Sequence, residues 1–347
     1  MNKRKVRRYL VVTMAVLALL LAACGNKTDR NAAAPASPGA SAPSESASSA
    51  PSETVEPSGA AEAQTLTITH ALGTTEVRKN PKKVIVFDFG ILDTLDKMGV
   101  EVLGVAKDSL PPYLEKFKDA RYENIGSLKE PDLEKISGLE PDLIVISGRQ
   151  SDYYEELSKL GPTVYLGLDT SRYWDSFREN MRTVASIFDR TDWMEQEMAQ
   201  IEAKVEAIKT KAGAQDKKGL IVLVTGGKLS AYGPGGRFGI IHDVLGIPAA
   251  DPNIEVSTHG MSVSYEYIAE KNPDYLFVVD RDQAVGSADA QGQSAAQVLD
   301  NELVRGTNAY KNGKIIYLDP EYWYLSGGGL VSVSAMVDEV AQDLGLN

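Results

Sequence analysis

The chain has 347 residues and is acidic, with 48 Asp and Glu residues against 36 Lys and Arg residues and a formal net charge of −12. Nucleic-acid binding needs clustered basic charge, so this composition argues against a nucleic acid as a partner. The sequence contains a single cysteine, which excludes an internal disulfide.

The first 23 residues have the features of a secretory signal peptide. Five basic residues precede the apolar stretch "YLVVTMAVLALLLAAC", which is shorter than the roughly 20 residues that span a bilayer comfortably. The stretch ends in Leu-Ala-Ala-Cys, which resembles the lipobox of bacterial lipoproteins, with Cys24 as the lipid acceptor. We therefore expect residues 1–23 to be removed and Cys24 to anchor the protein at the extracytoplasmic face of the cell membrane. The alternative is a plain signal peptide with an accidental cysteine.

Residues 25–64 consist mostly of Ala, Ser, Pro, Gly and Glu and contain no aromatic residue. Such a segment cannot bury enough apolar surface to offset the entropy that ordering would cost. We predict that residues 24–64, including the lipidated cysteine, form a disordered tether with an r.m.s. reach of roughly 35 Å.

From about residue 65 the composition becomes that of a globular body large enough for two domains. Short β-branched runs recur in it, namely "TLTIT", "KVIVFDF", "EVLGVA", "DLIVIS", "TVYLGL", "LIVLVT", "DYLFVV" and "KIIYL". Most have continuous apolar centres, which suits strands buried on both faces of a largely parallel sheet. Helical stretches such as "ILDTLDKMG" and "FGIIHDVLG" lie between them, so the sequence predicts an α/β fold.

An internal repeat divides this body. Residues 133–149, "LEKISGLEPDLIVISGR", align without gaps on residues 265–281, "YEYIAEKNPDYLFVVDR". Each copy reads as a helix, a Pro-Asp connection, an apolar strand and an arginine at the strand's carboxyl end. The earlier strand "KVIVFDFG" has a similar counterpart in "GLIVLVTG" at nearly the same offset. We therefore predict two α/β lobes of similar fold, residues 65–170 and 214–347.

The segment between the lobes, residues 171–213, has few helix breakers. Asp192 and Glu195 have the spacing of a capping box, and Gly213 is a candidate C-terminal cap. One apolar stripe runs along it at helical spacing, formed by Met194, Met198, Ile201, Val205 and Ile208. About 20 residues at 1.5 Å rise span roughly 30 Å, so we predict one long helix that joins the lobes as a stiff strut and buries this stripe.

Three arginines are candidates for ligand binding. In open α/β sheets, ligands bind beyond the carboxyl ends of the strands. Arg149 and Arg281 follow such strands, one in each lobe, and Arg237 lies in the glycine-rich loop "AYGPGGRFG". This loop matches neither a P-loop nor a dinucleotide fingerprint. Each arginine alone could form a surface ion pair, but the three together favour an anionic ligand in a cleft between the lobes.

The histidines and the aromatic run "DPEYWYLSGGG" leave two interpretations open. His70 and His242 are predicted to be structural, whereas His259, in the polar loop "VSTHGMS", fits a hydrated loop residue as well as a ligand. The run 319–329 carries three aromatic residues, the last of them Tyr324, before three glycines. The aromatics could close a core above a glycine turn, or Tyr324 could present its phenol oxygen beside a flexible segment.

Several motifs of this chain closely resemble those of the iron–siderophore-binding lipoproteins of bacterial ABC importers. They are the lipobox, the inter-lobe helix, "TGGKLSAYGPGGRFGIIHDVLG", "STHG", "EKNPDYLFVVDR" and "KIIYLDPEYWYLSG". The likeness covers residues 65–347, is strongest in the second lobe, and points to the receptors for catecholate siderophores such as petrobactin. It implies a class III periplasmic-binding-protein fold, with two Rossmann-like lobes joined by one long α-helix.

The resemblance also implies a function and its partners. The protein would be no enzyme and would have no intrinsic cofactor, because the ferric siderophore is its cargo. It would be a lipid-anchored monomer that delivers this cargo to an ABC permease and its ATPase.

Five residues match ligand-binding positions of these receptors. The resemblance implies that Arg149, Arg237 and Arg281 hold the anionic ferric complex. It further implies that His259 and Tyr324 ligate iron directly when the siderophore leaves coordination sites empty. Planar guanidinium groups suit delocalised anionic oxygens, and ferric iron is a hard Lewis acid that favours oxygen donors.

Glu134 and Glu266 occupy equivalent positions in the two copies of the repeat. They resemble the glutamates with which related receptors dock on arginines of the two permease subunits. The alternative is that both are merely solvated helix residues.

Other function classes make different demands on the sequence. A haem-binding receptor of the same architecture is the main alternative and would use one His or Tyr axial ligand in a more apolar pocket. A divalent-metal receptor would need several histidines together, and the three histidines here are scattered. An enzyme with His259 and Tyr324 as an acid–base pair would lack a nucleophile motif such as Gly-x-Ser-x-Gly.

Overall fold

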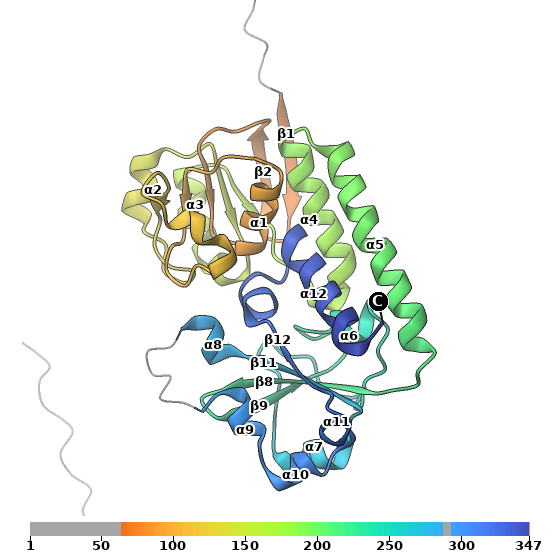
Figure 1. The fold of residues 1–347 in the computed structure, drawn as a ribbon. Helices are drawn as coiled ribbons and strands as arrows, with labels where there is room; N and C mark the ends of the chain where they lie inside the picture. Colours follow the sequence, from red (N-terminus) through yellow and green to blue (C-terminus); the bar gives the residue numbers. More distant parts are fainter. Residues whose placement is uncertain (1–63, 287–292, 347) are drawn as a thin grey trace, which may run out of the picture. The chain divides into compact units, whose positions relative to one another are not determined.

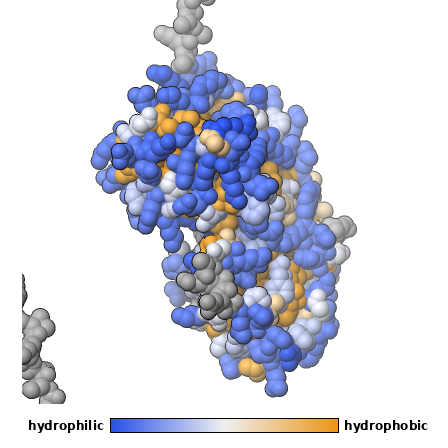
Figure 2. Space-filling model, turned by 60° about the vertical axis from the view of Figure 1, so that its left-hand side comes forward, coloured by the Kyte–Doolittle hydropathy of each residue, from blue (hydrophilic) through white to orange (hydrophobic). Residues whose placement is uncertain are grey.

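The computed structural model describes residues 64–286 and 293–346 (Figure 1). The predicted signal peptide, Cys24 and the predicted tether up to residue 63 lie outside the described residues. Within the described ranges, no helix combines the length and the apolarity that crossing a membrane requires. Figure 2 shows one face of the molecule, on which hydrophilic residues cover most of the surface and hydrophobic residues emerge in small groups.

The N-terminal lobe is built on a five-stranded sheet in the order β5-β4-β3-β6-β7, with all neighbours parallel. Its strands are β3 (Val84–Val86), β4 (Gly104–Val105), β5 (Glu123–Asn124), β6 (Leu143–Ile146) and β7 (Thr163–Tyr165). Every residue of β3 and β6 is buried, as expected for strands covered on both faces. The run "TLTIT" instead forms β1 (Thr65–His70), which pairs with β2 (Gly73–Arg78) in a separate antiparallel hairpin.

Helices and 3₁₀ turns connect the strands of this lobe. The helices are α1 (Phe89–Lys97), α2 (Leu133–Leu139) and α3 (Tyr154–Leu160). The 3₁₀ turns are η1 (Pro112–Lys118), η2 (Gly148–Tyr153) and η3 (Thr170–Arg172).

The C-terminal lobe has a mixed five-stranded sheet in the order β10-β9-β8-β11-β12. Its strands are β8 (Gly219–Thr225), β9 (Lys228–Tyr232), β10 (Met261–Val263), β11 (Tyr275–Asp280) and β12 (Ile315–Leu318). β8, β11 and β12 are parallel to one another, whereas β9 runs antiparallel to both of its neighbours, β8 and β10. The reversal follows from Gly226 and Gly227, which both have positive φ and form a two-residue hairpin turn.

The helices of the C-terminal lobe are short apart from the last one. They are α6 (Ile240–Asp243), α7 (Tyr265–Lys271), α8 (Arg281–Val285), α9 (Ala295–Leu299), α10 (Glu302–Arg305), α11 (Asn308–Lys311) and α12 (Leu330–Leu344). The helix predicted over "FGIIHDVLG" is therefore limited to the four residues of α6.

The two copies of the sequence repeat have the same local structure. In each copy the helix, α2 or α7, ends at a residue in the left-handed conformation, and the Pro-Asp pair then leads into the next strand, β6 or β11. The backbone N–H of Asp142 donates to the Lys83 carbonyl at 2.9 Å, and that of Asp274 donates to the Lys218 carbonyl at 2.9 Å. Each aspartate carboxylate also accepts a hydrogen bond from the N–H of the same lysine. The predicted similarity of the lobes thus extends to individual hydrogen bonds.

Two helices, rather than one, occupy the segment 171–213. They are α4 (Tyr173–Ile187) and α5 (Thr191–Gly213), separated at Asp189, whose φ is 51°. The Asp189 carboxylate accepts hydrogen bonds from Lys79 and Asn80, both at 2.7 Å, and so holds this break in place.

The longer helix α5 is the predicted strut. It has 23 residues, which gives a length of about 35 Å. The predicted apolar stripe is confirmed, because Met194, Met198, Ile201, Val205 and Ile208 are all buried. The predicted capping box is wrong: the helix begins at Thr191, and Glu195 instead pairs with Arg182 at 2.8 Å.

The N-terminus of α12 is capped by side chains of α1. The two carboxylate oxygens of Asp93 accept hydrogen bonds from the N–H groups of Val331 and Ser332, both at 3.1 Å. Thr94 Oγ1 accepts one from Leu330 N–H at 2.9 Å. Because α12 itself starts after glycines and has no side-chain cap of its own, the N-terminal lobe satisfies its free N–H groups.

The glycines before α12 are required by close packing. A Cβ on Gly329 would overlap the carbonyl oxygen of Gly90 and the carboxylate of Asp93, and a Cβ on Gly328 would lie 2.9 Å from Leu168 Cδ1. The glycine segment is therefore tightly packed between α1 and neighbouring side chains. This packing contradicts the interpretation that the glycines after Tyr324 form a flexible segment.

Ionisation of Asp93 is expected to make the free energy of unfolding depend on pH. Burial raises the pKa of Asp93 to about 7, against the opposing hydrogen bonds from Ser332, Val331 and Tyr113. A carboxyl group with a raised pKa stabilises the fold fully only below its unfolded pKa of about 4, and this contribution is lost as the pH rises through about 7. The loss amounts to roughly 4 kcal/mol at most.

We expect Asp93→Asn, which cannot ionise, to flatten this dependence in urea unfolding curves recorded between about pH 4.5 and about pH 7.5. Asp96→Asn is the control, because Asp96 lies on the same helix but pairs with Lys116 near the surface. A wild-type slope that persists in Asp93→Asn would show that another group titrates.

Candidate functional site

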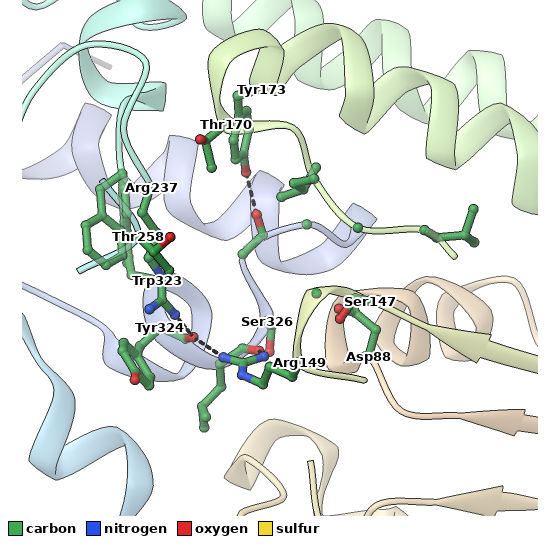
Figure 3. Close-up of a pocket in the computed structure, with 18 of the residues that line it drawn as sticks. Asp88, Ser147, Arg149, Thr170, Tyr173, Arg237, Thr258, Trp323, Tyr324 and Ser326 are labelled. Atoms are coloured by element: carbon green, nitrogen blue, oxygen red, sulfur yellow. Dashed lines mark hydrogen bonds between the residues drawn. The ribbon is translucent and has the colours of Figure 1, made fainter. Parts of the chain in front are cut away.

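A cavity of about 600 Å³ lies at the carboxyl ends of the strands and is lined by both lobes (Figure 3). The walls from the N-terminal lobe include Asp88, Ser147, Arg149 and Tyr165; those from the C-terminal lobe include Arg237, Val256, Thr258, Tyr324 and Ser326. Asp88 follows β3, Arg149 follows β6 and Tyr165 ends β7. The position therefore follows from the parallel topology of the sheet.

Arg149 and Arg237 meet at one backbone oxygen. Arg149 Nη2 donates to the carbonyl of Tyr324 at 2.9 Å, and Arg237 Nη2 donates to the same oxygen at 2.8 Å. Arg149 Nη1 also donates to the Leu325 carbonyl at 3.4 Å. Within the described ranges, neither guanidinium forms an ion pair with a carboxylate, so their positive charge is available to a ligand. Burial lowers the pKa of Arg149 and the charge of Arg237 lowers it further, while the negative charge of Asp88 opposes this shift.

The local fold holds both arginines in place. Arg149 lies in η2 directly after the buried strand β6, where the N–H of Ser147 donates to Gln150 Oε1 at 3.1 Å. Arg237 lies in the glycine-rich loop, which Asp243 fixes by accepting the Gly235 N–H at 2.7 Å. Gly235 has a φ of 70°, a conformation that favours glycine.

The phenol of Tyr324 is surrounded by positive charge. Arg281 Nε donates to Tyr324 Oη at 2.9 Å, and the guanidinium of Arg237 lies 4.2 Å from the centre of the Tyr324 ring. Burial opposes ionisation of the phenol, but the charge of Arg237 and the hydrogen bond and charge of Arg281 leave the pKa of Tyr324 below its ordinary value. A phenol with a lowered pKa becomes an anionic oxygen donor more readily.

Arg281 differs from the other two arginines. It is not part of the cavity wall, and besides Tyr324 it contacts Thr225 Oγ1 at 3.3 Å and Asp282 Oδ1 at 3.5 Å. Its charge is thus partly compensated, and its contact with the cavity runs through the Tyr324 phenol.

The three aromatic residues of the run "EYWY" have different environments. They lie in a π-helical turn, η4 (Glu321–Ser326), a local structure that is frequent at functional sites. Trp323 is buried and its ring N–H donates to Glu339 at 2.6 Å. Tyr322 packs on Tyr113, with ring centres 4.8 Å apart. Trp323 and Tyr324 both line the cavity, whereas Tyr322 does not, so Tyr324 is the tyrosine of this run that presents a phenol at the site.

His259 lies next to the cavity but is not part of its wall. It is exposed in the loop before β10, and its neighbour Thr258 lines the cavity. The structure thus brings the three arginines to Tyr324 and leaves His259 outside this group. Among the described side chains, no cluster of three or more His, Cys, Asp or Glu residues could hold a metal ion.

The other histidines have the structural contacts predicted for them. His242 Nδ1 is hydrogen-bonded to the carbonyl of Ile247 at 2.8 Å, and His70 Nε2 to Thr75 Oγ1 at 3.1 Å. Burial lowers the pKa of both histidines, which favours the neutral ring.

Glu134 and Glu266 occupy matching places on the two lobes. Each is the second residue of its helix, α2 or α7, and each side chain is exposed. Their equivalence in the repeat is therefore an equivalence in three dimensions as well.

Among the polar residues of the cavity wall that sequence reasoning missed are Asp88 and Tyr165. Both lie at the carboxyl end of a buried strand. Arg149 was chosen as a candidate by the rule that ligands bind beyond such strand ends. Applied to "KVIVFDF" and "TVYLGL", the same rule would have found them.

The chain belongs to the periplasmic binding protein family, whose sequence profile matches residues 84–322. The match confirms the predicted α/β fold of two lobes joined by a long helix, and the family is one of binding proteins.

Relatives with similar sequence or structure include binding proteins for petrobactin, ferric anguibactin and catecholate siderophores. The petrobactin-binding protein YclQ of Bacillus subtilis is 52% identical over 283 residues, which cover 80% of this chain and 88% of YclQ. Its crystal structure matches with a TM-score of 0.78 and covers 81% of this chain and 99% of that one. The ferric-anguibactin-binding protein FatB of Vibrio anguillarum is 33% identical and covers 79% of this chain and 86% of FatB.

The catecholate-siderophore-binding protein VctP of Vibrio cholerae matches in structure with a TM-score of 0.76 and 36% identity, covering 80% of this chain and 100% of VctP. These matches confirm the resemblance to siderophore-binding proteins that the motifs predicted.

Proposed function

We propose that this protein binds a ferric siderophore of the catecholate type outside the cytoplasm and delivers it to an ABC permease for iron uptake. The observation that carries the proposal is the convergence of Arg149 and Arg237 on Tyr324 in one cavity, with no carboxylate pairing either arginine within the described part of the chain. The similarity to the petrobactin-binding protein YclQ supports the same function.

The charges of the cavity suit such a ligand. A ferric tris-catecholate carries three negative charges, and planar guanidinium groups bind delocalised anionic oxygens while being weakly hydrated themselves. A protein that is acidic as a whole can focus a positive field inside one cleft, so the net charge of −12 does not oppose an anionic cargo.

Tyr324 and His259 are the proposed direct ligands of iron. The phenol of Tyr324 has a lowered pKa and would bind Fe³⁺ as phenolate when the siderophore leaves coordination sites empty. His259 would have to turn inward from its exposed loop, whose residue Thr258 already lines the cavity.

The remaining parts of the proposal concern location and partners. Cys24 would carry the lipid anchor at the extracytoplasmic face, and the tether would give the binding lobes reach above the membrane. We propose that the protein acts as a monomer, and that Glu134 and Glu266 contact the permease.

A titration of intrinsic fluorescence tests the function. The mature protein, titrated with a panel of ferric siderophores that includes citrate-hydroxamates, is expected to bind bis- and tris-catecholates most tightly. Equal or tighter binding of haemin, seen as a shifted Soret band, would overturn the proposal in favour of a haem receptor.

Tyr324→Phe and His259→Ala are expected to affect two ligands differently. With a tetradentate ferric bis-catecholate, each change should weaken binding by about tenfold, because iron loses a donor from the protein. With a hexadentate tris-catecholate, which fills the iron shell, the effect should be about threefold or less. The ligand-to-metal charge-transfer band of the bis-catecholate complex should shift in both variants.

Tyr322→Phe is the matched control, because Tyr322 lies in the same turn but packs on Tyr113 outside the cavity. Equal losses for both ligands in Tyr324→Phe, with an unchanged absorption band, would assign Tyr324 a structural role only.

A further inference from the structure

The cavity wall carries one carboxylate, Asp88, besides the two arginines Arg149 and Arg237. Asp88 belongs to the wall, and Figure 3 shows it beside Ser147, away from Arg237 and Tyr324. Its Oδ1 accepts the N–H of Ile91 at 2.9 Å and so caps α1. Within the described residues its second oxygen accepts no hydrogen bond and forms no ion pair. Arg149, the arginine of the same lobe, donates instead to the carbonyls of Tyr324 and Leu325.

A tyrosine ring accompanies this carboxylate. Tyr165 is half-buried in the same wall, and its ring rests on Gly167, where a Cβ would overlap it. Burial raises the pKa of Tyr165, and the negative charges of Asp88 and Asp169 raise it further. The phenol therefore keeps its proton, and the ring stays neutral next to a carboxylate. This is the reverse of Tyr324, whose pKa the arginines lower.

We propose that Asp88 and Tyr165 form a second subsite of the cavity, which binds a protonated amine carried by the organic framework of the ferric ligand. The inference rests on the proposed function and specifies its ligand further. A carboxylate together with the face of an aromatic ring is a combination that recognises ammonium groups. The cavity then offers the arginines at Tyr324 for the anionic iron centre and the Asp88 carboxylate, which also attracts the charge of Arg149, for a cationic arm.

The subsite gives the protein a means of discriminating between ferric complexes with the same iron coordination. A ligand with an amine would pair with the Asp88 carboxylate when the cavity loses its water. A ligand without one would leave that carboxylate desolvated and facing an anion, and both effects are unfavourable.

Two synthetic ferric bis-catecholates of equal linker length test the proposal, one with a secondary amine in the linker and one with a methylene group in its place. Asp88→Asn keeps an acceptor for the cap of α1 and removes only the charge. We expect this variant to bind the amine ligand about tenfold more weakly and the methylene ligand severalfold more tightly. Tyr165→Leu should weaken the binding of the amine ligand severalfold, while Tyr165→Phe, which keeps the ring, should leave this affinity unchanged.

Asp132→Asn is the matched control, since Asp132 caps α2 through the same contact, to Lys135 N–H at 2.9 Å, and is not part of the cavity wall. Opposite changes for the two ligands in Asp88→Asn would support the subsite. If the affinities for both ligands change in the same direction, or do not change, Asp88 acts only as a helix cap and the proposed subsite is overturned. Failure of the wild-type protein to bind either complex would overturn the proposed function itself, and the subsite with it.

Discussion

Charge reversal at both proposed docking positions, Glu134→Lys with Glu266→Lys, is expected to abolish siderophore-dependent iron uptake and to leave ligand affinity unchanged. Both side chains are exposed at the start of equivalent helices, one on each lobe, and neither lines the cavity. A single exposed ion pair contributes only about 0–1 kcal/mol. Reversal at both sites, however, would turn two attractions to permease arginines into two repulsions, and such like-charge contacts cost several kcal/mol.

Uptake of radiolabelled iron, in cells whose own copy of the receptor gene is deleted, measures this effect. The control variant is Glu155→Lys with Glu302→Lys, which reverses two other exposed glutamates in the first turns of helices, again one on each lobe. Full transport by the Glu134→Lys, Glu266→Lys protein would show that these residues are merely solvated.

Loss of either cavity arginine should weaken the binding of tetradentate and hexadentate ferric catecholates alike. Arg149→Ala or Arg237→Ala is expected to cost about 2–3 kcal/mol, or about 30- to 150-fold in Kd. The reason is twofold: the ligand loses an unpaired positive charge, and the carbonyl of Tyr324 loses one of its two guanidinium donors. Charge attraction acts whichever groups fill the iron shell, so both ligands are affected, in contrast to Tyr324→Phe.

Arg237→Lys separates charge from geometry, because it keeps the charge and loses the planar fork; we expect an intermediate affinity. Arg182→Ala is the control, since Arg182 pairs with Glu195 on the surface and is not part of the cavity wall. Kd values for Arg149→Ala and Arg237→Ala within about twofold of wild type would remove the arginines from the proposed site.

The sequence was sufficient wherever a local pattern carries the information. The buried strands are marked by continuous apolar runs, and the apolar stripe of α5 recurs at the helical period. The repeat of helix, Pro-Asp connection and strand is visible as an ungapped alignment of the two copies. The same repeat located Arg149 and Arg281 at strand ends, because the carboxyl ends of parallel strands meet at one edge of a sheet.

The sequence pattern did not predict the places where one or two residues change the direction of the chain. Gly226 and Gly227 reverse the chain into β9, which therefore runs antiparallel to β8, although the strand sequences themselves suit a parallel sheet. Asp189 interrupts the helical segment because Lys79 and Asn80, far away in the sequence, hold its carboxylate.

Contacts between distant segments were decided by the tertiary structure alone. The sequence of α12 does not reveal that Asp93 and Thr94 cap it, because these residues precede it by more than 200 positions. Likewise, the run "EYWY" does not reveal which tyrosine lines the cavity. Tyr322 packs on Tyr113 outside it, whereas the guanidinium groups of Arg237 and Arg281 lie against Tyr324. Residue types and their spacing thus determined which side chains could bind an anionic ligand, whereas packing between the lobes determined that the arginines meet at Tyr324 and that His259 stays outside.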